Sequence, residues 1–214
     1  LGVAYADEGV ELRKAGIRLP IMVMNTEEAG FDNMIRYKLE PELYSLRILM
    51  AFKDYLEFKN ISHYPVHIKI ETGMHRLGFD EDQWQLLAEL LSQTTCFKIA
   101  SIFSHLAAGG DALFNSFTKE QSVLLTKATN LLEQAVGYKV IKHIANTSAI
   151  HHHPDLQMNM VRLGIGLYGV DADKKVQQQL KNVTTLKTTI SQIKKKKKGE
   201  SVGYSRSVIV EEDK

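Results

Sequence analysis

The alternation of short apolar runs with amphipathic segments is the feature that most limits how this chain can fold. Across the first two-thirds of the 214 residues, strand-length apolar runs and segments with helical spacing follow one another about seven times. Strands separated by helices pair in parallel, and the helices cover the sheet. Units of roughly 20–30 residues fit most of an eight-stranded barrel better than an open sheet. We therefore predict an α/β fold that forms most of a (β/α)8 TIM-type barrel.

The expected elements can be assigned to residue ranges. After about Val170 the pattern changes to a β-type run at 183–193, a turn at 198–200 and a second strand at 202–210. We therefore predict a partial barrel domain at 1–180 and the beginning of a C-terminal β-domain at 181–214. Both ends look cut, which predicts a fragment of a longer protein. In the barrel, strands are expected at 1–5, 20–24, 35–39, 66–70, 97–103, 139–145 and 158–161, helices at 7–15, 44–59, 82–92, 119–134 and 148–152, and a helix or loop at 27–34.

Composition excludes several classes of protein. No apolar run is long enough to span a bilayer and no signal peptide opens the chain, so we expect no membrane partner and a cytoplasmic location. The single cysteine, Cys96, excludes a disulfide within the chain. The net charge of +2 includes the five lysines at 194–198, so the rest of the chain is acidic and a nucleic-acid surface is not expected.

A glycine-punctuated segment, NMVRLGIGLYG at 159–169, is the first candidate site. Gly164 and Gly166 lack a Cβ, so the backbone can approach a ligand closely, and the amides of Gly164 and Ile165 can cradle an anion. Arg162 lies among apolar neighbours. On this segment alone, a core strand with a structural turn remains equally open. Other polar residues also follow predicted strands, and in a barrel such residues face one pocket: Lys69, Arg76, His105, Asn146 and Thr147.

Six segments together resemble the alanine racemases, fold-type III enzymes that use pyridoxal 5'-phosphate (PLP). They occur in the order expected for that family, at 4–16, 67–78, 103–107, 143–149, 159–169 and 199–204. The resemblance covers nearly the whole chain. It implies interconversion of L- and D-alanine for peptidoglycan precursors, by a homodimer in a bacterial cytoplasm.

The resemblance also implies how the cofactor is held. Arg162 matches the arginine that faces the pyridine nitrogen of PLP, where a permanent cation keeps that nitrogen unprotonated. Gly164 and Ile165 match the backbone cradle for the phosphate. Thr147 matches a hydroxyl donor to the same phosphate, with Asn146 beside it.

The catalytic roles follow from the same resemblance. Tyr204 matches the tyrosine base on the L-alanine side, which comes from the partner subunit, so the active site is composite. His105 matches the histidine between that tyrosine and Arg162, and nearby cations lower the tyrosine's pKa. Arg76 matches the arginine near the cofactor phenolate and the substrate carboxylate. Lys69 matches a lysine that is often carbamylated in this family, and a carbamate there could hold Arg76 in place.

The chain departs from the family pattern in one large respect. The lysine that binds PLP covalently lies on the first barrel strand in the family, and no residue here matches it, so the resemblance implies a (β/α)8 TIM-type barrel lacking its first strand. Without that lysine, we expect these residues alone to be inactive, with the function belonging to the intact protein. Smaller departures are Glu71 for an aspartate, His75 for a small residue, and Gly203 before the tyrosine.

Other functions remain to be weighed. One is a racemase with broader substrates such as serine or lysine, and another is a non-catalytic PLP-binding barrel protein, against which the β-type residues 183–210 argue. Fusion to a ligase of cell-wall synthesis is a third. The consecutive histidines at 151–153 lack the i, i+4 spacing of a helical metal site, so no metal is expected.

Overall fold

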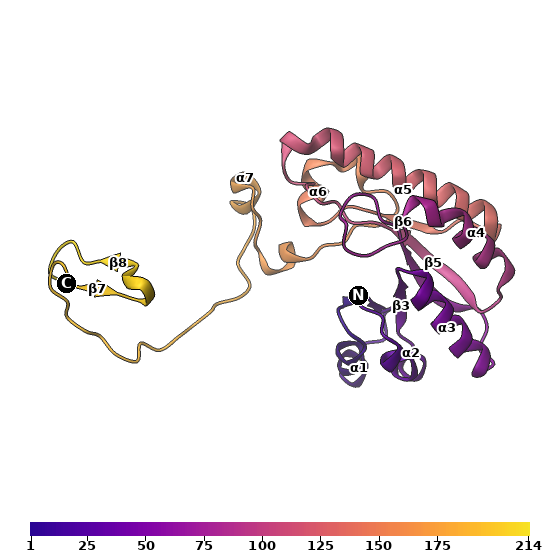
Figure 1. The fold of residues 1–214 in the computed structure, drawn as a ribbon, viewed down its shortest axis with the longest axis horizontal. Coiled ribbons are helices and arrows are strands. Elements are labelled where there is room, and N and C mark those ends of the chain that lie inside the picture. Colours follow the sequence, from indigo (N-terminus) through magenta and orange to yellow (C-terminus); the bar gives the residue numbers. More distant parts are fainter. The chain divides into compact units, whose positions relative to one another are not determined.

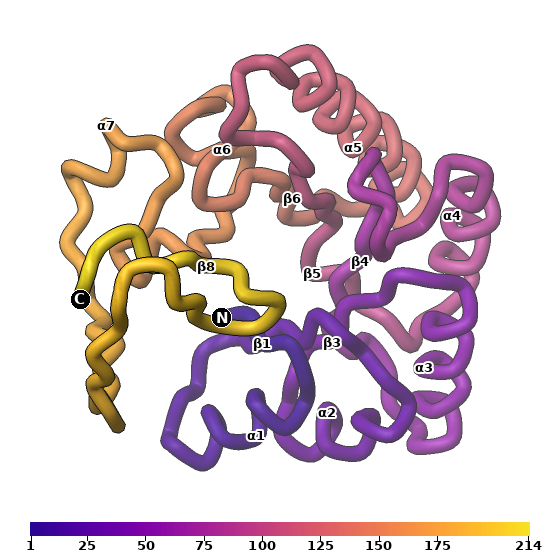
Figure 2. Tube along the Cα trace, turned by 60° about the vertical axis from the view of Figure 1, so that its left-hand side comes forward, coloured from indigo at the N-terminus to yellow at the C-terminus, as the bar shows by residue number.

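The computed structural model describes residues 1–214, which divide into two compact units, Leu1–Asn182 and Val183–Lys214. In the first unit, six strands form one parallel sheet in sequence order, from β1 to β6 (Figure 1). The sheet curls into a half-barrel with the helices on its outer side (Figure 2). The strands are β1 (Gly2–Val3), β2 (Met22–Val23), β3 (Glu40–Leu43), β4 (Tyr64–Lys69), β5 (Phe97–Phe103) and β6 (Ile141–His143).

The helices of the first unit are α1 (Ala6–Lys14), α2 (Phe31–Tyr37), α3 (Leu46–Phe58), α4 (Trp84–Gln93), α5 (Asn115–Val136), α6 (Thr147–His152) and the short α7 (Lys174–Gln177). Helices α1 to α6 each follow a strand of the sheet and bury apolar residues, whereas α7 buries none. Ser45 is the N-cap of α3, since its hydroxyl oxygen accepts a hydrogen bond from the Ile48 amide. At the other end of the sheet, α5 stops at Gly137, whose φ of +80° suits glycine. No helix in the structure combines the length and apolar character needed to cross a membrane.

An aromatic cluster joins the helices to the sheet. Phe52 of α3 is fully buried, and its ring centroid lies 4.9 Å from that of Phe31, 5.6 Å from that of Tyr64 and 6.3 Å from that of Phe97. Because Phe31 belongs to α2, Tyr64 to β4 and Phe97 to β5, one side chain ties four elements together. This packing holds the sheet rigid, so residues at the strand ends keep fixed positions.

The sequence pattern places the third strand too early. The strand expected at 35–39 is wrong, because residues 35–37 are the last residues of α2 and the strand is β3. Phe31 and Met34 are buried at helical spacing, and Lys38, with a φ of +51°, ends the helix. The strand itself therefore contains Glu40 and Glu42, which an apolar pattern does not detect.

The strand expected at 158–161 is also not formed. The segment runs beside β6 and is joined to it by hydrogen bonds from the Asn159 amide to the Lys142 carbonyl, 3.1 Å, and from the Arg162 amide to the Ala145 carbonyl, 3.0 Å. Between them, the Lys142 amide donates to the side-chain oxygen of Asn159, 3.0 Å, instead of to a backbone carbonyl. Because a side-chain oxygen takes the place of a backbone carbonyl, the ladder of backbone hydrogen bonds with β6 is interrupted, and the segment is extended without being a regular strand.

The second unit contains a small antiparallel hairpin, β7 (Ser201–Val202) with β8 (Val208–Ile209). The strand expected at 183–193 is wrong, since those residues form no regular element and have no partner strand. The strand expected at 202–210 is instead both arms of the hairpin, because Gly203, with a φ of +83°, and Ser205, with a φ of +54°, reverse the chain inside it. That this unit begins a β-domain stays a prediction.

Candidate functional site

A cavity of about 680 Å³ lies in the first unit, among residues that follow β2, β5 and β6. Its size is that of a small-molecule site. Its polar lining consists mainly of cations and hydrogen-bond donors, and no lysine, aspartate or glutamate lines it. The lining residues are Leu1, Gly2, Met22, Met24, Arg76, His105, His143, Asn146, Thr147, Ser148, Met160, Val161, Arg162, Leu163, Gly164 and Ile165.

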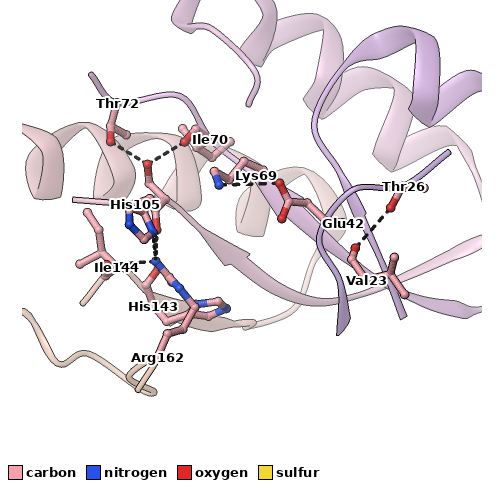
Figure 3. Close-up of polar contacts among 11 residues, drawn as sticks. Val23, Thr26, Glu42, Lys69, Ile70, Thr72, His105, His143, Ile144 and Arg162 are labelled. Carbon is pink, nitrogen blue, oxygen red and sulfur yellow. Dashed lines mark hydrogen bonds and ion pairs between the residues drawn. The ribbon is translucent and has the colours of Figure 1, made fainter. Parts of the chain in front are cut away.

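The guanidinium of Arg162 is fixed by several contacts on one side of this cavity. Its Nη2 atom donates to the carbonyl oxygens of Ser104, 2.6 Å, and Ile144, 3.2 Å (Figure 3). Its Cζ atom lies 5.1 Å from the centroid of the Phe103 ring. Burial lowers the pKa of Arg162 to about 10, against the opposing effect of Glu42, so the side chain is a cation at neutral pH.

A chain of hydrogen bonds leads from Arg162 into the barrel wall. Its Nη1 atom lies 2.5 Å from His143 Nδ1, and His143 Nε2 lies 2.9 Å from Ser101 Oγ. Ser101 Oγ is in turn 2.7 Å from His67 Nδ1, and His67 Nε2 is 2.9 Å from Glu40 Oε2. The chain thus crosses three neighbouring strands, β6, β5 and β4, and ends on a carboxylate of β3.

The two ends of this chain determine the direction of the bonds next to them. A guanidinium only donates, so His143 Nδ1 accepts and its Nε2–H donates to Ser101. At the other end a carboxylate only accepts, so the His67 Nε2–H donates to Glu40. His143 is therefore a neutral Nε2–H tautomer. For His143, burial and the nearby Arg162 lower the pKa to about 2, which agrees with a neutral ring.

His105 is also held neutral. Burial, with Arg162 as the second cause, lowers its pKa to about 4. Its Nδ1 atom lies 3.3 Å from Arg162 Nη2, and its Nε2 atom lies 3.5 Å from the Asn146 side-chain nitrogen. The shorter contact is to a charged donor, so Nδ1 accepts from Arg162 and the ring proton lies on Nε2. The loop that carries His105 is anchored by Gln121 of α5, whose side chain donates to the His105 carbonyl, 3.1 Å, and accepts from the Ala107 amide, 3.1 Å.

The glycine-rich segment and the start of α6 meet in the cavity lining. Thr147 Oγ1 accepts hydrogen bonds from the amides of Gly164, 3.0 Å, and Gly166, 3.4 Å, so its own hydroxyl hydrogen remains available to a ligand. A Cβ at Gly166 would lie 2.8 Å from Leu163 Cδ1 and 2.9 Å from Thr147 Cγ2, so any other residue would displace one of these side chains. Asn146 caps α6 by accepting from the Ala149 amide, 3.2 Å.

The structure brings most of the predicted site residues together, with two exceptions. Arg76, His105, Asn146, Thr147, Arg162, Gly164 and Ile165 all line the cavity. Lys69 does not line it and is buried in the wall, with Nζ 3.7 Å from Glu42 Oε1. Tyr204 belongs to the second unit, where its side chain is 99% exposed.

Sequence reasoning missed the residues that support Arg162 from behind. His143 stood inside one of the recognised segments but received no role, and Ser101 and His67 gave no signal as isolated polar residues on strands. Glu40 and Glu42 were hidden because the pattern placed the third strand before them.

The fold and the site define a β/α half-barrel protein with a cavity of small-molecule size that two arginines and neutral polar groups line. The family model "Alanine racemase, N-terminal domain" matches residues 1–172. The alanine racemase of Clostridium tetani is 35% identical over 219 residues, which cover 100% of this chain and 56% of that protein. The chain belongs to the alanine racemase family.

Solved structures agree with this assignment. The alanine racemase of Clostridium difficile matches with a TM-score of 0.79 and 30% identity, over 100% of this chain and 56% of that one. The alanine racemase of Bartonella henselae, described with covalently bound pyridoxal phosphate, matches with a TM-score of 0.80 and 26% identity, over 99% of this chain and 58% of that one. The chain spans about half the length of the curated relatives it matches.

Proposed function

We propose that the protein interconverts L- and D-alanine with pyridoxal phosphate as cofactor, and supplies D-alanine for peptidoglycan precursors in the cytoplasm. The observation that carries the proposal is the donor set of the cavity, which suits a ligand with a phosphate at one end and an acceptor nitrogen at the other. Arg162 presents a fixed cation, and the Thr147 hydroxyl with the Ile165 amide presents neutral donors.

Each residue has a role that its geometry supports. Arg162 would donate to the pyridine nitrogen through its Nε–H, since both Nη atoms already have acceptors, and a guanidinium of pKa about 10 keeps its proton beside a pyridine. The Thr147 hydroxyl and the Ile165 amide would hold the phosphate, with Asn146 fixing the start of α6 beside them. Gly164 would lie beside the phosphate, while its amide is bonded to Thr147. Arg76 would bind the substrate carboxylate. PLP, when bound, supplies an electron sink that makes the α-hydrogen of the amino acid acidic.

Proton transfer on the L-alanine side would belong to Tyr204. His105, neutral and protonated at Nε2, can donate a hydrogen bond to the phenolate oxygen, and Arg162 behind it stabilises that negative charge. We propose that Tyr204 reaches the cavity of a partner subunit, which makes the protein a homodimer with two composite sites.

Binding of the cofactor by this chain gives the first test. Titration of the chain with PLP, followed by its visible absorbance and by calorimetry, is expected to show one site per chain. Arg162→Ala should weaken binding by about tenfold or more, whereas the control Arg18→Ala, at an exposed arginine, should not change it. Equal binding by both variants would contradict the proposed site.

Activity and the composite site require the intact protein. A coupled assay with alanine, serine and lysine would identify the substrate, and a preference for serine or lysine would favour a broad-specificity racemase. Mixing Tyr204→Phe and Arg162→Ala subunits should restore about a quarter of the normal activity, since half of the dimers then hold one intact site. No restoration would show that both residues act within one subunit.

A further inference from the structure

An ion pair in the barrel wall, Glu42 with Lys69, takes no part in the proposed function. The two residues lie on the neighbouring strands β3 and β4, where Glu42 pairs with His67, two residues before Lys69 on the same face. Their side chains are 1% and 4% exposed, and Lys69 Nζ lies 3.7 Å from Glu42 Oε1 (Figure 3). Neither residue lines the cavity.

Each member of the pair depends on the other. Neither carboxylate oxygen of Glu42 has a hydrogen-bond partner, so the Lys69 ammonium is its compensating group. The ammonium also contacts the Phe103 ring, whose centroid is 4.8 Å from Nζ. A buried charge of either sign is unfavourable without its counter-charge, so the two side chains stabilise each other's ionised forms.

The surroundings of Glu42 are cationic. Arg162 stands over the same Phe103 ring that Lys69 contacts, and Arg76 and Arg162 both act on Glu42 through space. Burial raises the pKa of Glu42 and lowers the pKa of Lys69, while each partner opposes the shift of the other. If the Glu42 carboxylate were removed, the effects that remain on Lys69 would be its burial and the charges of Arg76 and Arg162. All three favour the neutral amine.

We propose that Glu42 is the counter-ion of Lys69 in this wall, that it keeps Lys69 as an ammonium, and that Lys69 consequently carries no carbamate. Carbamylation requires the neutral amine: its lone pair forms a bond to the carbon of CO2, one N–H proton is lost to solvent, and a side chain with one negative charge results. At Lys69 that charge would lie beside the buried carboxylate of Glu42, where two like charges repel. Glu42 already provides the negative charge that a carbamate would bring to the arginines.

The experiment measures carbamate directly by 13C NMR of the protein in 13C-bicarbonate buffer, so its outcome does not depend on racemase activity. The wild-type protein is expected to show no carbamate carbon, and Glu42→Gln is expected to gain one that disappears in Glu42→Gln with Lys69→Met. Glu120→Gln, at an exposed glutamate of α5, is the matched control and should resemble the wild type. A carbamate on wild-type Lys69 would overturn the proposal, and so would its absence from a folded Glu42→Gln variant.

A second measurement on the wild-type protein covers the case in which Glu42→Gln does not fold. The 15N chemical shift of Lys69 Nζ, assigned by its loss in Lys69→Met, distinguishes an ammonium from an amine. An ammonium at neutral pH is the expected result, and an amine or a carbamate would refute the assignment.

Discussion

Replacing Ser101 by alanine tests the hydrogen-bond chain behind Arg162. The Ser101 side chain is 1% exposed, and its hydroxyl lies 2.7 Å from His67 Nδ1 and 2.9 Å from His143 Nε2. Without it, two buried imidazole nitrogens, His67 Nδ1 and His143 Nε2, lose their partner. At about 1–3 kcal/mol for each unsatisfied group, the free energy of unfolding should fall by about 2–6 kcal/mol.

The chain contains its own probe for this measurement. Trp84, the single tryptophan, is buried on α4, so its fluorescence reports urea unfolding of the first unit. Ser92→Ala, which removes an exposed hydroxyl bonded only to the Glu89 carbonyl, should change stability by less than about 0.5 kcal/mol. The reasoning fails if Ser101→Ala is as stable as Ser92→Ala, with both m-values unchanged.

Three further outcomes are expected. His105 has a pKa of about 4 in the folded protein against an ordinary 6.5, so the unfolded chain binds more protons between these pH values. The free energy of unfolding should therefore fall as the pH decreases through that window. His105→Gln should reduce the dependence of the urea unfolding midpoint on pH between about pH 7 and about pH 5. Gly166→Ala should lower the affinity for PLP about tenfold, measured by calorimetry, because the added methyl group displaces Thr147. Gly164→Ala is the control, because a Cβ there meets only an atom 3.8 Å away. Equal PLP affinities of the two variants would refute the close fit at Gly166. Phe52→Ala should cost about 3–5 kcal/mol in urea unfolding, and Phe58→Ala, at a side chain 78% exposed, should cost little; equal losses would contradict the core assignment.

The sequence was sufficient for the order of the elements and for the parallel sheet, because apolar periodicity reports burial on one face. The sequence-based prediction failed where the buried residues are polar or charged. β3 contains Glu40, Pro41 and Glu42, and the two carboxylates point into the barrel wall, so the pattern favoured the residues before it. At 158–161 the apolar run correctly indicated an extended segment beside β6, but the Asn159 side chain interrupts the backbone hydrogen bonds that a regular strand needs.

The candidate site divides in the same way. Residues in recognisable segments, such as Arg162 and His105, could be proposed from sequence, and the structure brings them to one cavity. The chain from His143 to Glu40 could not, since its members are far apart in sequence and meet only through the register of four strands. The pairing of Glu42 with Lys69 depends on the same register.

A crystal structure of the protein with PLP tests the central claim most directly. We predict the phosphate beside Gly164, bound by the Ile165 amide and the Thr147 hydroxyl, with the pyridine nitrogen facing the Arg162 guanidinium. A cofactor bound elsewhere on the protein, or one in this cavity with its phosphate against Arg162, would contradict the account.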